Sequence, residues 1–410
     1  MKIAIVDGYS TGAALARRLA GAGVACVHVQ SRADVQPFFL RAFRPQDYVL
    51  DLGFTEDVTG VAEQLRRHRV SRVLAGTESG VLLAETLSHA LGLPTNVPEL
   101  LHARRDKALM AEAVRAAGLA TPHSTVVRSA RAAADWFAAS GLAEAVVKPL
   151  ASAGTDGVTF CGSPEEVARA GHAVLSAPNA FGEPNRAVLV QQRVHGTEYY
   201  INTVSVAGIH HTAEIWRYTK RVGPAATPIY DFEEPVAPAS AEGQVLTAFV
   251  GEVLDALGIA ETPAHTEVML TSEGPVLIET GARLGGATAP DVVDTYLGLS
   301  QTSLAVAAVT DPRSLGSHGA ADVSGGRWLR CVEFINHHRG RVSAEALTKI
   351  SELPSVVFAT PAADPGTLLE PTTDLLTSPG YAYFAASDLT ELMHDYETLR
   401  AWEHQGIYTR

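Results

Sequence analysis

The stretch that decides the fold of this chain runs from His265 to Gly286, His-Thr-Glu-Val-Met-Leu-Thr-Ser-Glu-Gly-Pro-Val-Leu-Ile-Glu-Thr-Gly-Ala-Arg-Leu-Gly-Gly. Two short apolar segments flank Thr-Ser-Glu-Gly-Pro, a pattern that predicts a β-hairpin. Glu267 and Glu279 are equally distant from Glu273, so we expect them to face each other as cross-strand neighbours. The opposite face, expected to be buried, then carries Val268, Leu270, Val276 and Ile278.

The facing carboxylates indicate a ligand. Like charges directly opposite each other are destabilising, so Glu267 and Glu279, with Arg283 just beyond them, predict a bound cation and a bound anion. Mg²⁺ and a polyphosphate are the candidates. The alternative interpretation is a solvated hairpin face without a ligand, and a one-residue slip in register would also separate the two glutamates.

Length and composition indicate a globular protein of several domains. The chain has 410 residues, of which 46% are hydrophobic and 19% are charged, so about two to four compact units are expected. No apolar run approaches the roughly 20 residues of a membrane helix. The first residues reach Asp7 too early for a signal peptide and predict a strand. We therefore expect a cytoplasmic protein without a membrane partner.

Charge and cysteine usage exclude other classes. The formal net charge is -13 and no basic run is present, which argues against nucleic acid as a partner because phosphate backbones are bound by clustered Lys and Arg. Cys26, Cys161 and Cys331 are odd in number and far apart, so neither a disulfide framework nor a zinc cluster is indicated. A small-molecule substrate is expected.

Lysine is scarce in this chain, since only five of the 32 basic residues are lysines. A lysine retained in an arginine-rich chain hints at a position that needs a compact ammonium group. For Lys2 and Lys349 accidental retention is the simpler explanation. The lysines that this hint applies to are Lys107, Lys148 and Lys220.

Strands and helices alternate over the first hundred residues, which predicts a doubly wound parallel α/β sheet. Strands are expected at 2–7, 24–29, 48–52 and 72–75, and helices at 13–22 and 61–69. The loop 7–12 lacks a full G-x-G-x-x-G and gives little support for a nicotinamide site. Glu78 follows the fourth strand at its carboxyl end, where open α/β sheets bind ligands. It would hold a substrate amine or, as is more common, cap the next helix.

The middle of the chain contains a small-residue loop beside a lysine. A helix is expected from about Lys107 to Gly118, and the strand 145–149 ends in Lys148. The sequence Ala-Ser-Ala-Gly-Thr-Asp-Gly follows at 151–157, before a strand at 158–161. The loop predicts a flexible flap whose amides cover phosphates. A glycine-rich hairpin turn is the alternative.

The remaining pattern predicts further strands and a small terminal unit. Strands are expected at 187–192 and 199–206, a mobile Pro/Ala-rich loop or linker at 223–241, and a helix at 248–257. After Gly325 a small α+β unit is expected, with apolar strands at 329–335, 355–359 and 381–386 and a helix at 344–350.

The order of these motifs resembles that of the ATP-grasp carboxylate–amine ligases. The motifs are Lys107, Lys148, the flap, the strand ending in Val-Gln-Gln-Arg-Val, Gly-Thr-Glu198, Glu267, Glu279 and Arg283. Within that family the chain is most similar to the L-amino-acid (dipeptide) ligases of the bacilysin and dapdiamide type. The match spans roughly residues 2–310, and the tail from about 327 resembles the extra carboxyl-terminal domain of that branch.

The resemblance implies four domains in a multi-domain α/β (α+β) chain. Residues 1–100 would form a Rossmann-like domain, 101–190 the central lid subdomain, 191–325 the carboxyl-terminal ATP-grasp catalytic subdomain, and 326–410 the appended α+β domain.

The resemblance also implies a nucleotide site. Lys107 and Lys148 would contact the phosphates, with Lys148 also near the adenine, and Glu198 would bind the ribose hydroxyls. The flap would close over the β- and γ-phosphates with Ser152, Gly154, Thr155 and Gly157. The adenine would be held by Gln191, Gln192 and the main chain of Arg193 and Val194.

Glu267 and Glu279 would hold one or two Mg²⁺ ions, and Arg283 would neutralise the transferring phosphoryl group. These roles suit phosphoryl transfer, which needs positioning and charge stabilisation. Two positions depart from the family pattern. Many relatives have an acidic residue at the position of Gln192 and an Asn at the position of Gly281. Because a carboxamide can ligate Mg²⁺, one metal would be held more weakly or through water.

The implied reaction is ATP-dependent activation of a carboxylate to an acyl phosphate, followed by attack of an amine, with release of ADP and phosphate. His265 would contact the substrate or orient the amine, and a structural role is the alternative. Arg217 would bind a substrate carboxylate, or lie on an ordinary charged surface strand. The other substrate-side candidates are Trp216, Lys220 and Gly286, with Glu78.

Two other functions are compatible with such a core. One is a carboxylase-like or purine-biosynthetic ligase that uses a different acid, and the other is a non-catalytic nucleotide-binding protein. The sequence does not identify the two substrates. A homodimer is expected only by analogy with related ligases.

Overall fold

The chain forms two compact units in a computed structural model that describes residues 1–410 except 153, 224–226, 318–325, 362, 376 and 410. The first unit comprises Met1–Thr121, Tyr199–Ile215 and Ala237–Asp322, and the second comprises Pro122–Glu198, Trp216–Val236 and Val323–Arg410. Three sequence predictions fall partly outside the described residues: Ala153 of the flap, positions 224–226 of the Pro/Ala-rich stretch, and the domain boundary at 325. The division into four domains remains a prediction.

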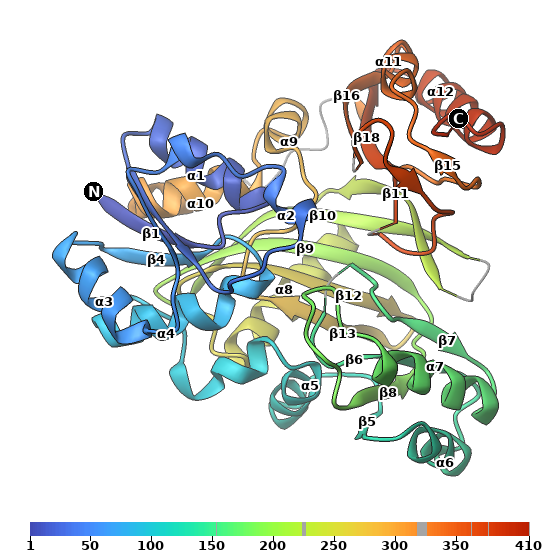
Figure 1. Ribbon diagram of the computed structural model, residues 1–410, viewed down its shortest axis with the longest axis horizontal. Helices are drawn as coiled ribbons and strands as arrows, with labels where there is room; N and C mark the ends of the chain where they lie inside the picture. Colours follow the sequence, from blue (N-terminus) through green and yellow to red (C-terminus); the bar gives the residue numbers. More distant parts are fainter. Residues whose placement is uncertain (153, 224–226, 318–325, 362, 376, 410) are drawn as a thin grey trace. The chain divides into compact units, whose positions relative to one another are not determined.

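The first unit begins with the predicted parallel sheet. Its strand order is β3-β2-β1-β4, and β1 pairs in parallel with both β2 and β4. The strands are β1 (Lys2–Val6), β2 (Ala25–Gln30), β3 (Leu50–Phe54) and β4 (Arg72–Ala75). The helices are α1 (Thr11–Gly21), α2 (Pro37–Leu40), α3 (Val58–Arg67) and α4 (Val81–Leu91). Figure 1 shows α1 on one face of this sheet and α3 with α4 on the other, as the alternating pattern predicted.

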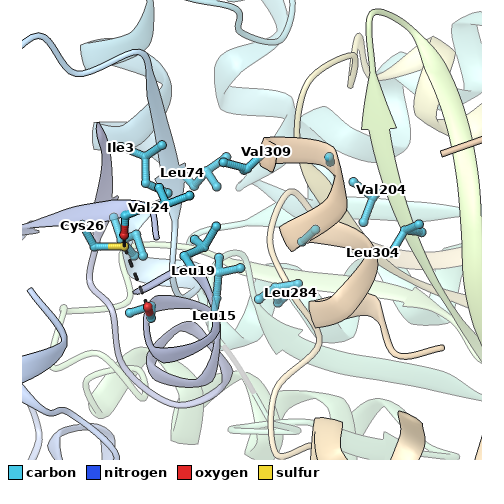
Figure 2. Packing of buried hydrophobic residues seen from close by; sticks show 14 of the residues in the cluster. Ile3, Leu15, Leu19, Val24, Cys26, Leu74, Val204, Leu284, Leu304 and Val309 are labelled. Carbon is cyan, nitrogen blue, oxygen red and sulfur yellow. Dashed lines mark hydrogen bonds between the residues drawn. The ribbon is translucent and has the colours of Figure 1, made fainter. Parts of the chain in front are cut away.

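A shared apolar core fixes this sheet to later parts of the first unit. Leu15 and Leu19 of α1 face α10 (Gln301–Thr310), which contributes Leu304 and Val309 (Figure 2). Leu284, which follows Arg283, is buried in the same cluster. The loop after the hairpin is therefore anchored by the burial of apolar side chains, the main stabilising contribution in folding.

The predicted hairpin is present in the first unit as β12 (Pro263–Thr271) and β13 (Gly274–Gly281). The strands of this part follow the order β13-β12-β9-β10, with β9 spanning Thr197–Val206 and β10 Ile209–Val222. Helix α8 (Ala241–Ala256) contacts both hairpin strands, and α5 (Lys107–Ala116) contacts β13. The α8 helix begins earlier than the predicted 248, because the Ser240 side chain accepts a hydrogen bond from the Gly243 amide and caps the helix there.

The register of the hairpin confirms one prediction and corrects another. Glu267 pairs with Glu279, as expected. The register then shifts, so that Val268 pairs with Leu277 and Ile278 is the additional residue of a β-bulge. Val268 and Leu277 are therefore buried. Three residues predicted on the buried face are only half-buried, namely Leu270, Val276 and Ile278.

The second unit contains a four-stranded antiparallel sheet in the order β5-β8-β6-β7. These strands are β5 (Ser124–Val127), β6 (Ala145–Pro149), β7 (Thr159–Cys161) and β8 (Val188–Gln192). Helices α6 (Ala130–Ser140) and α7 (Pro164–Ser176) start at the capping serines 129 and 163 and bury their apolar faces against it.

The rest of the second unit is an antiparallel sheet in the order β10-β11-β14-β18-β16, counted from the end of β10. It comprises β11 (Pro228–Val236), β14 (Trp328–Glu333), β18 (Gly380–Ala386) and β16 (Val356–Pro361). Helices α11 (Ala346–Ser351) and α12 (Leu389–His404) and the short pair β15 (Gly340–Arg341) and β17 (Leu368–Leu369) complete it. The predicted strands and helix after residue 325 are confirmed, and α12 was missed.

The interpretation of residues 223–241 as a mobile loop or linker was wrong for the central part of that stretch. Residues 228–236 form β11, and its Asp231 accepts hydrogen bonds from Arg221 (2.6 Å), Tyr396 (2.8 Å) and Arg400 (2.6 Å). Asp231 is buried, so these partners stabilise its charge and hold the strand in place. The Pro/Ala composition did not reveal them.

Two short α-helices follow the hairpin in the first unit. They are α9 (Pro290–Leu297) and α10, and they meet at an angle of 94°. Within the described residues no single helix is long and apolar enough to cross a membrane, and this bent pair passes only by length and composition.

We expect Leu19→Ala to lower the free energy of unfolding of the first unit by about 2–4 kcal/mol, because Leu19 is fully buried between α1 and α10. Val49→Ala is the matched control, since that side chain is 65% exposed, and its effect should stay below about 0.5 kcal/mol. Urea unfolding followed by circular dichroism measures both. Equal midpoints for the two variants would contradict the assignment of this core.

Candidate active site

The two hairpin glutamates lie beside a lysine of the first unit. Lys107 is the first residue of α5, whose N-cap Asp106 accepts bonds from the Ala108 and Leu109 amides. Its Nζ donates to Oε1 of Glu279 at 2.8 Å. The side chains of Glu267 and Glu279 remain 20% and 29% exposed. The repulsion between the facing carboxylates is thus reduced by an ammonium group, and both remain accessible to a ligand.

His265 is fixed by a relay of polar side chains. The Nδ2 atom of Asn202 donates to Glu214 Oε1 at 2.9 Å, so Oδ1 of Asn202 faces His265 Nδ1 at 2.8 Å. The His265 Nδ1 therefore donates, and Nε2 lies 3.8 Å from Glu267 Oε1. Burial lowers the pKa of His265; Glu267 opposes that shift and Arg283 adds to it.

Glu78 lies in the short 3-10 helix Glu78–Gly80 after β4 and is only 7% exposed. Its Oε2 accepts from Arg283 Nε at 2.8 Å and its Oε1 from Arg105 Nη1 at 2.7 Å. Burial raises the pKa of Glu78, but the charges of Arg105 and Arg283 outweigh it and lower the pKa below the ordinary value. The predicted capping role is not seen, because no side-chain cap bond is present at this helix or at α4.

Gly281 ends β13, and the space beside it is filled. A Cβ atom there would lie 2.6 Å from Glu78 Oε2 and 3.3 Å from Arg283 Nε. A side chain at position 281 would therefore force the Glu78 carboxylate to shift. This gives a physical reason for the absence of a carboxamide at this position.

The donor set fits a hard divalent cation. Mg²⁺ is commonly bound through one or two carboxylates plus phosphate oxygens and water, and Glu267 and Glu279 supply two carboxylates. Within the described part of the chain no group of three His, Cys, Asp or Glu side chains is arranged to hold a metal. These two carboxylates would therefore supply only part of a coordination shell.

In the second unit, Lys148 and the adenine candidates lie on neighbouring strands. Lys148 on β6 pairs with Leu189 of β8, and Gln191 on β8 pairs with Val146 of β6. Lys148 and Gln191 are buried, whereas Gln192 is exposed and its amide donates to the His123 carbonyl at 2.7 Å.

The predicted flap follows β6, and its described residues are held by contacts within the loop and to residue 180. Ser152 Oγ donates to Asp156 at 2.6 Å, and Asp156 accepts from the Ala180 amide at 2.8 Å. Gly154, Thr155 and Gly157 all have positive φ values near 65°, a backbone conformation that glycine adopts readily and other residues rarely. The sharp turns of this loop thus depend on its glycines, and the flexibility predicted for it remains untested.

The connection after β8 and the start of β9 carry charged pairs. Arg193 donates to Glu144 at 2.9 Å and lies over the Phe160 ring, and Val194 beside it is half-buried. Glu198 accepts from Lys220 at 2.6 Å. Glu198, the predicted ribose ligand, and Lys220, a substrate candidate, therefore form an ion pair in this unit.

The remaining substrate candidates lie in different environments. Trp216 is 1% exposed and packs edge-on against Tyr383, so the Trp216 ring is not accessible to a substrate. Arg217 is exposed and donates to Glu234 at 2.7 Å. Gly286 in the first unit is exposed, with open space around it.

Sequence reasoning missed three residues that shape the first unit's site. Arg105 holds Glu78, and Asn202 and Glu214 orient His265. Asn202 lies in the predicted strand 199–206, and Glu214 lies in β10, which the sequence analysis did not predict, so no local signal identified either residue. Arg105, two residues before Lys107, could have been weighed together with it.

We expect ¹⁵N NMR at pH 7.5 to show His265 as the neutral tautomer protonated on Nδ1. Burial lowers the pKa of this imidazole below 6.5, so it is uncharged at pH 7.5, and Asn202 accepts the Nδ1 proton. Asn202→Leu should broaden or shift the Nδ1 signal, and His210 serves as the internal reference. A signal for His265 protonated on Nε2 would contradict the relay.

Comparison with known proteins identifies the family. Residues 143–291 match an ATP-grasp domain. Over 385 residues, covering 92% of this chain and 90% of the relative, the sequence is 33% identical to dapdiamide A synthase from Enterobacter agglomerans.

Solved structures share the fold. An L-amino acid ligase from Bacillus licheniformis superposes with a TM-score of 0.75 at 19% identity, covering 98% of this chain and 97% of that chain. Carboxyaminoimidazole ribonucleotide synthase from Aspergillus clavatus, solved with ATP, gives 0.70 at 13% identity, covering 99% and 98%. The sequence relationship and the motif order agree, and the chain belongs to the ATP-grasp carboxylate–amine ligases, most similar to the L-amino-acid ligases of the dapdiamide type.

Proposed function

We propose that this protein is an ADP-forming ligase that joins the carboxylate of one amino acid to the amine of a second. The observation that carries the proposal is the in-register pairing of Glu267 with Glu279, with Lys107 bonded to Glu279. In a chain of this family, paired carboxylates beside a cation suit phosphoryl transfer from ATP.

Residues of the first unit would bind the metal ion and the phosphoryl group. Mg²⁺ held by Glu267 and Glu279 would neutralise charge on the phosphate oxygens. Lys107 would add a positive charge to a phosphate, and Arg283 would face the phosphoryl group during transfer. The proposal is supported by the placement of all four residues within one unit.

The proposal also assigns nucleotide contacts to residues of the second unit. Lys148 would contact phosphate, Gln191 and Gln192 with the main chain of Arg193 and Val194 would hold adenine, and Glu198 would bind ribose. The proposal is supported by the pairing of β6 with β8, which aligns Lys148 and Gln191 on neighbouring strands. The flap residues Ser152, Gly154, Thr155 and Gly157 would close over the β- and γ-phosphates.

The proposed reaction has two steps. A carboxylate oxygen of the first amino acid attacks the γ-phosphorus of ATP, and ADP leaves, which gives an acyl phosphate. The amine nitrogen of the second amino acid then attacks the acyl carbon, and phosphate leaves as the amide forms. The protein's contribution is to hold the two reactants in line and to exclude water. His265, oriented by Asn202, would contact the amine.

Three finer statements belong to the same proposal. The cytoplasm as location is supported by three free cysteines, Cys26, Cys161 and Cys331, all buried. The proposal that the protein is a homodimer comes from its resemblance to related ligases.

Among the substrate candidates, Arg217 on the exposed side of β10 would bind a carboxylate in place of Glu234.

A screen of amino-acid pairs tests the proposed function. With ATP and Mg²⁺, we expect ADP and phosphate to appear only when two suitable amino acids are present, with a product whose mass is their sum less one water. Phosphate release with bicarbonate and an amine, but with no amino-acid pair, would favour the purine-biosynthetic type of ligase. ATP binding without ADP formation from any pair would indicate a non-catalytic protein.

We expect Glu279→Gln to lower ADP formation by at least about 10²-fold, because it removes one charge from the proposed metal ligands. The midpoint of thermal unfolding should change little, since this side chain is partly exposed. Glu273→Gln, in the exposed turn of the same hairpin, is the matched control and should retain full turnover. Near-normal turnover in Glu279→Gln would rule out the metal assignment.

A further inference from the structure

The Glu78 carboxylate joins two arginines from different parts of the first unit. Arg105 precedes α5, and Arg283 follows β13, 205 residues beyond Glu78 in the sequence. Each carboxylate oxygen accepts from a different guanidinium, at 2.7 and 2.8 Å. All three side chains are at least four-fifths buried. Such charge-assisted bonds in a largely buried place fix the geometry of the groups that make them.

These contacts restrict how the Arg283 guanidinium can turn. Its Nε donates to Glu78, and its Nη1 donates to the Leu284 carbonyl at 2.9 Å. Among the contacts described for the chain, none uses Nη2. The guanidinium is therefore held at two of its three nitrogens, Nε and Nη1, and the hydrogens on Nη2 remain available to an anion.

Gly281 makes room for this arrangement. Its backbone does not have a positive φ, so glycine is not required there for conformation. It matters for space, because a Cβ would come within 2.6 Å of Glu78 Oε2, closer than real Cβ contacts allow, so that the carboxylate would have to shift. Any other residue at 281 would displace the Glu78 carboxylate, and with it the partner of Arg283.

We propose that Glu78 and Gly281 act together as positioning residues for Arg283. This inference rests on the proposed function of Arg283 at the phosphoryl group. Glu78 orients the guanidinium through Nε, and Gly281 leaves the space that Glu78 occupies. Glu78 thus acts through Arg283, which differs from the sequence-based hypothesis that it holds the substrate amine.

The first test is Glu78→Gln, which keeps the shape of the side chain and removes its charge. We expect kcat to fall by about 10²-fold, as a misplacement of around 1 Å can cause, with KM for both amino acids changed less than about threefold. Glu78→Asp should recover part of kcat, since it restores the charge. A raised KM for the amine substrate at near-normal kcat would overturn the proposal and identify Glu78 as a substrate ligand.

A matched control separates positioning from stability. Glu85 in the same unit is buried and bonded to Arg104 and Asn96, far along the sequence from the hairpin. Glu85→Gln breaks a comparable buried ion pair, so it should lower the thermal midpoint about as much as Glu78→Gln while leaving kcat within about threefold. An equal loss of kcat in both variants would show that the effect is structural and would refute the positioning role.

The second test is a double-mutant cycle between positions 78 and 281. Gly281→Ala alone should lower kcat as Glu78→Gln does, because the methyl group displaces the carboxylate. In a Glu78→Ala background Gly281→Ala should cause little further loss, since the space is vacated. Gly251→Ala, on α8 with open space around it, controls for the added methyl. Additive losses would contradict the shared mechanism.

A readout without turnover uses arginine NMR. The Nε–Hε signal of Arg283, assigned with Arg283→Lys, should exchange slowly in the wild type and rapidly in Glu78→Gln and Gly281→Ala. An unchanged signal would refute the inference even if activity falls. If the wild-type protein forms no ADP with any amino-acid pair, the proposed function fails while this measurement still decides whether Glu78 and Gly281 fix Arg283.

Discussion

The in-register pairing of Glu267 with Glu279 is the constraint on which the site of the first unit depends. It brings two carboxylates to neighbouring places, and the bulge at Ile278 then turns Val268 and Leu277 inward. Helices α5 and α8 pack on the hairpin, and α5 delivers Lys107 to Glu279. One local pairing therefore sets the acidic face, its buried back and its cationic neighbour.

Charge compensation explains how the surroundings tolerate so many ionised groups. Removing a charge from water is costly unless hydrogen bonds replace its hydration. Glu78 has two guanidiniums, and Asp231 in the second unit has two arginines and a tyrosine. In both units an acid joins segments that are distant in sequence. The same interaction thus fixes side chains at a candidate site and a strand in a terminal sheet.

Several site features were predictable because they are local or linear. The alternation of strands and helices to residue 75, the hairpin, and Lys107 at the start of a helix follow from periodicity and turn residues. The order of the motifs along the chain was sufficient to identify the family. The missed features are non-local, such as the Asn202–Glu214 relay to His265 and the strand β11, whose partners Arg221 and Arg400 are unrelated to its own composition.

The sequence by itself determined the family, the facing glutamates and the absence of a side chain at Gly281. Only the tertiary structure decided what that glycine is for. Glu78 follows a strand of the parallel sheet, 205 residues before Arg283, which follows the hairpin. Its carboxylate nevertheless lies against Gly281. Glycine in a sequence can indicate a conformation or a space, and here φ and the Cβ contact select the space. That distinction depends on a neighbour that no local pattern can name.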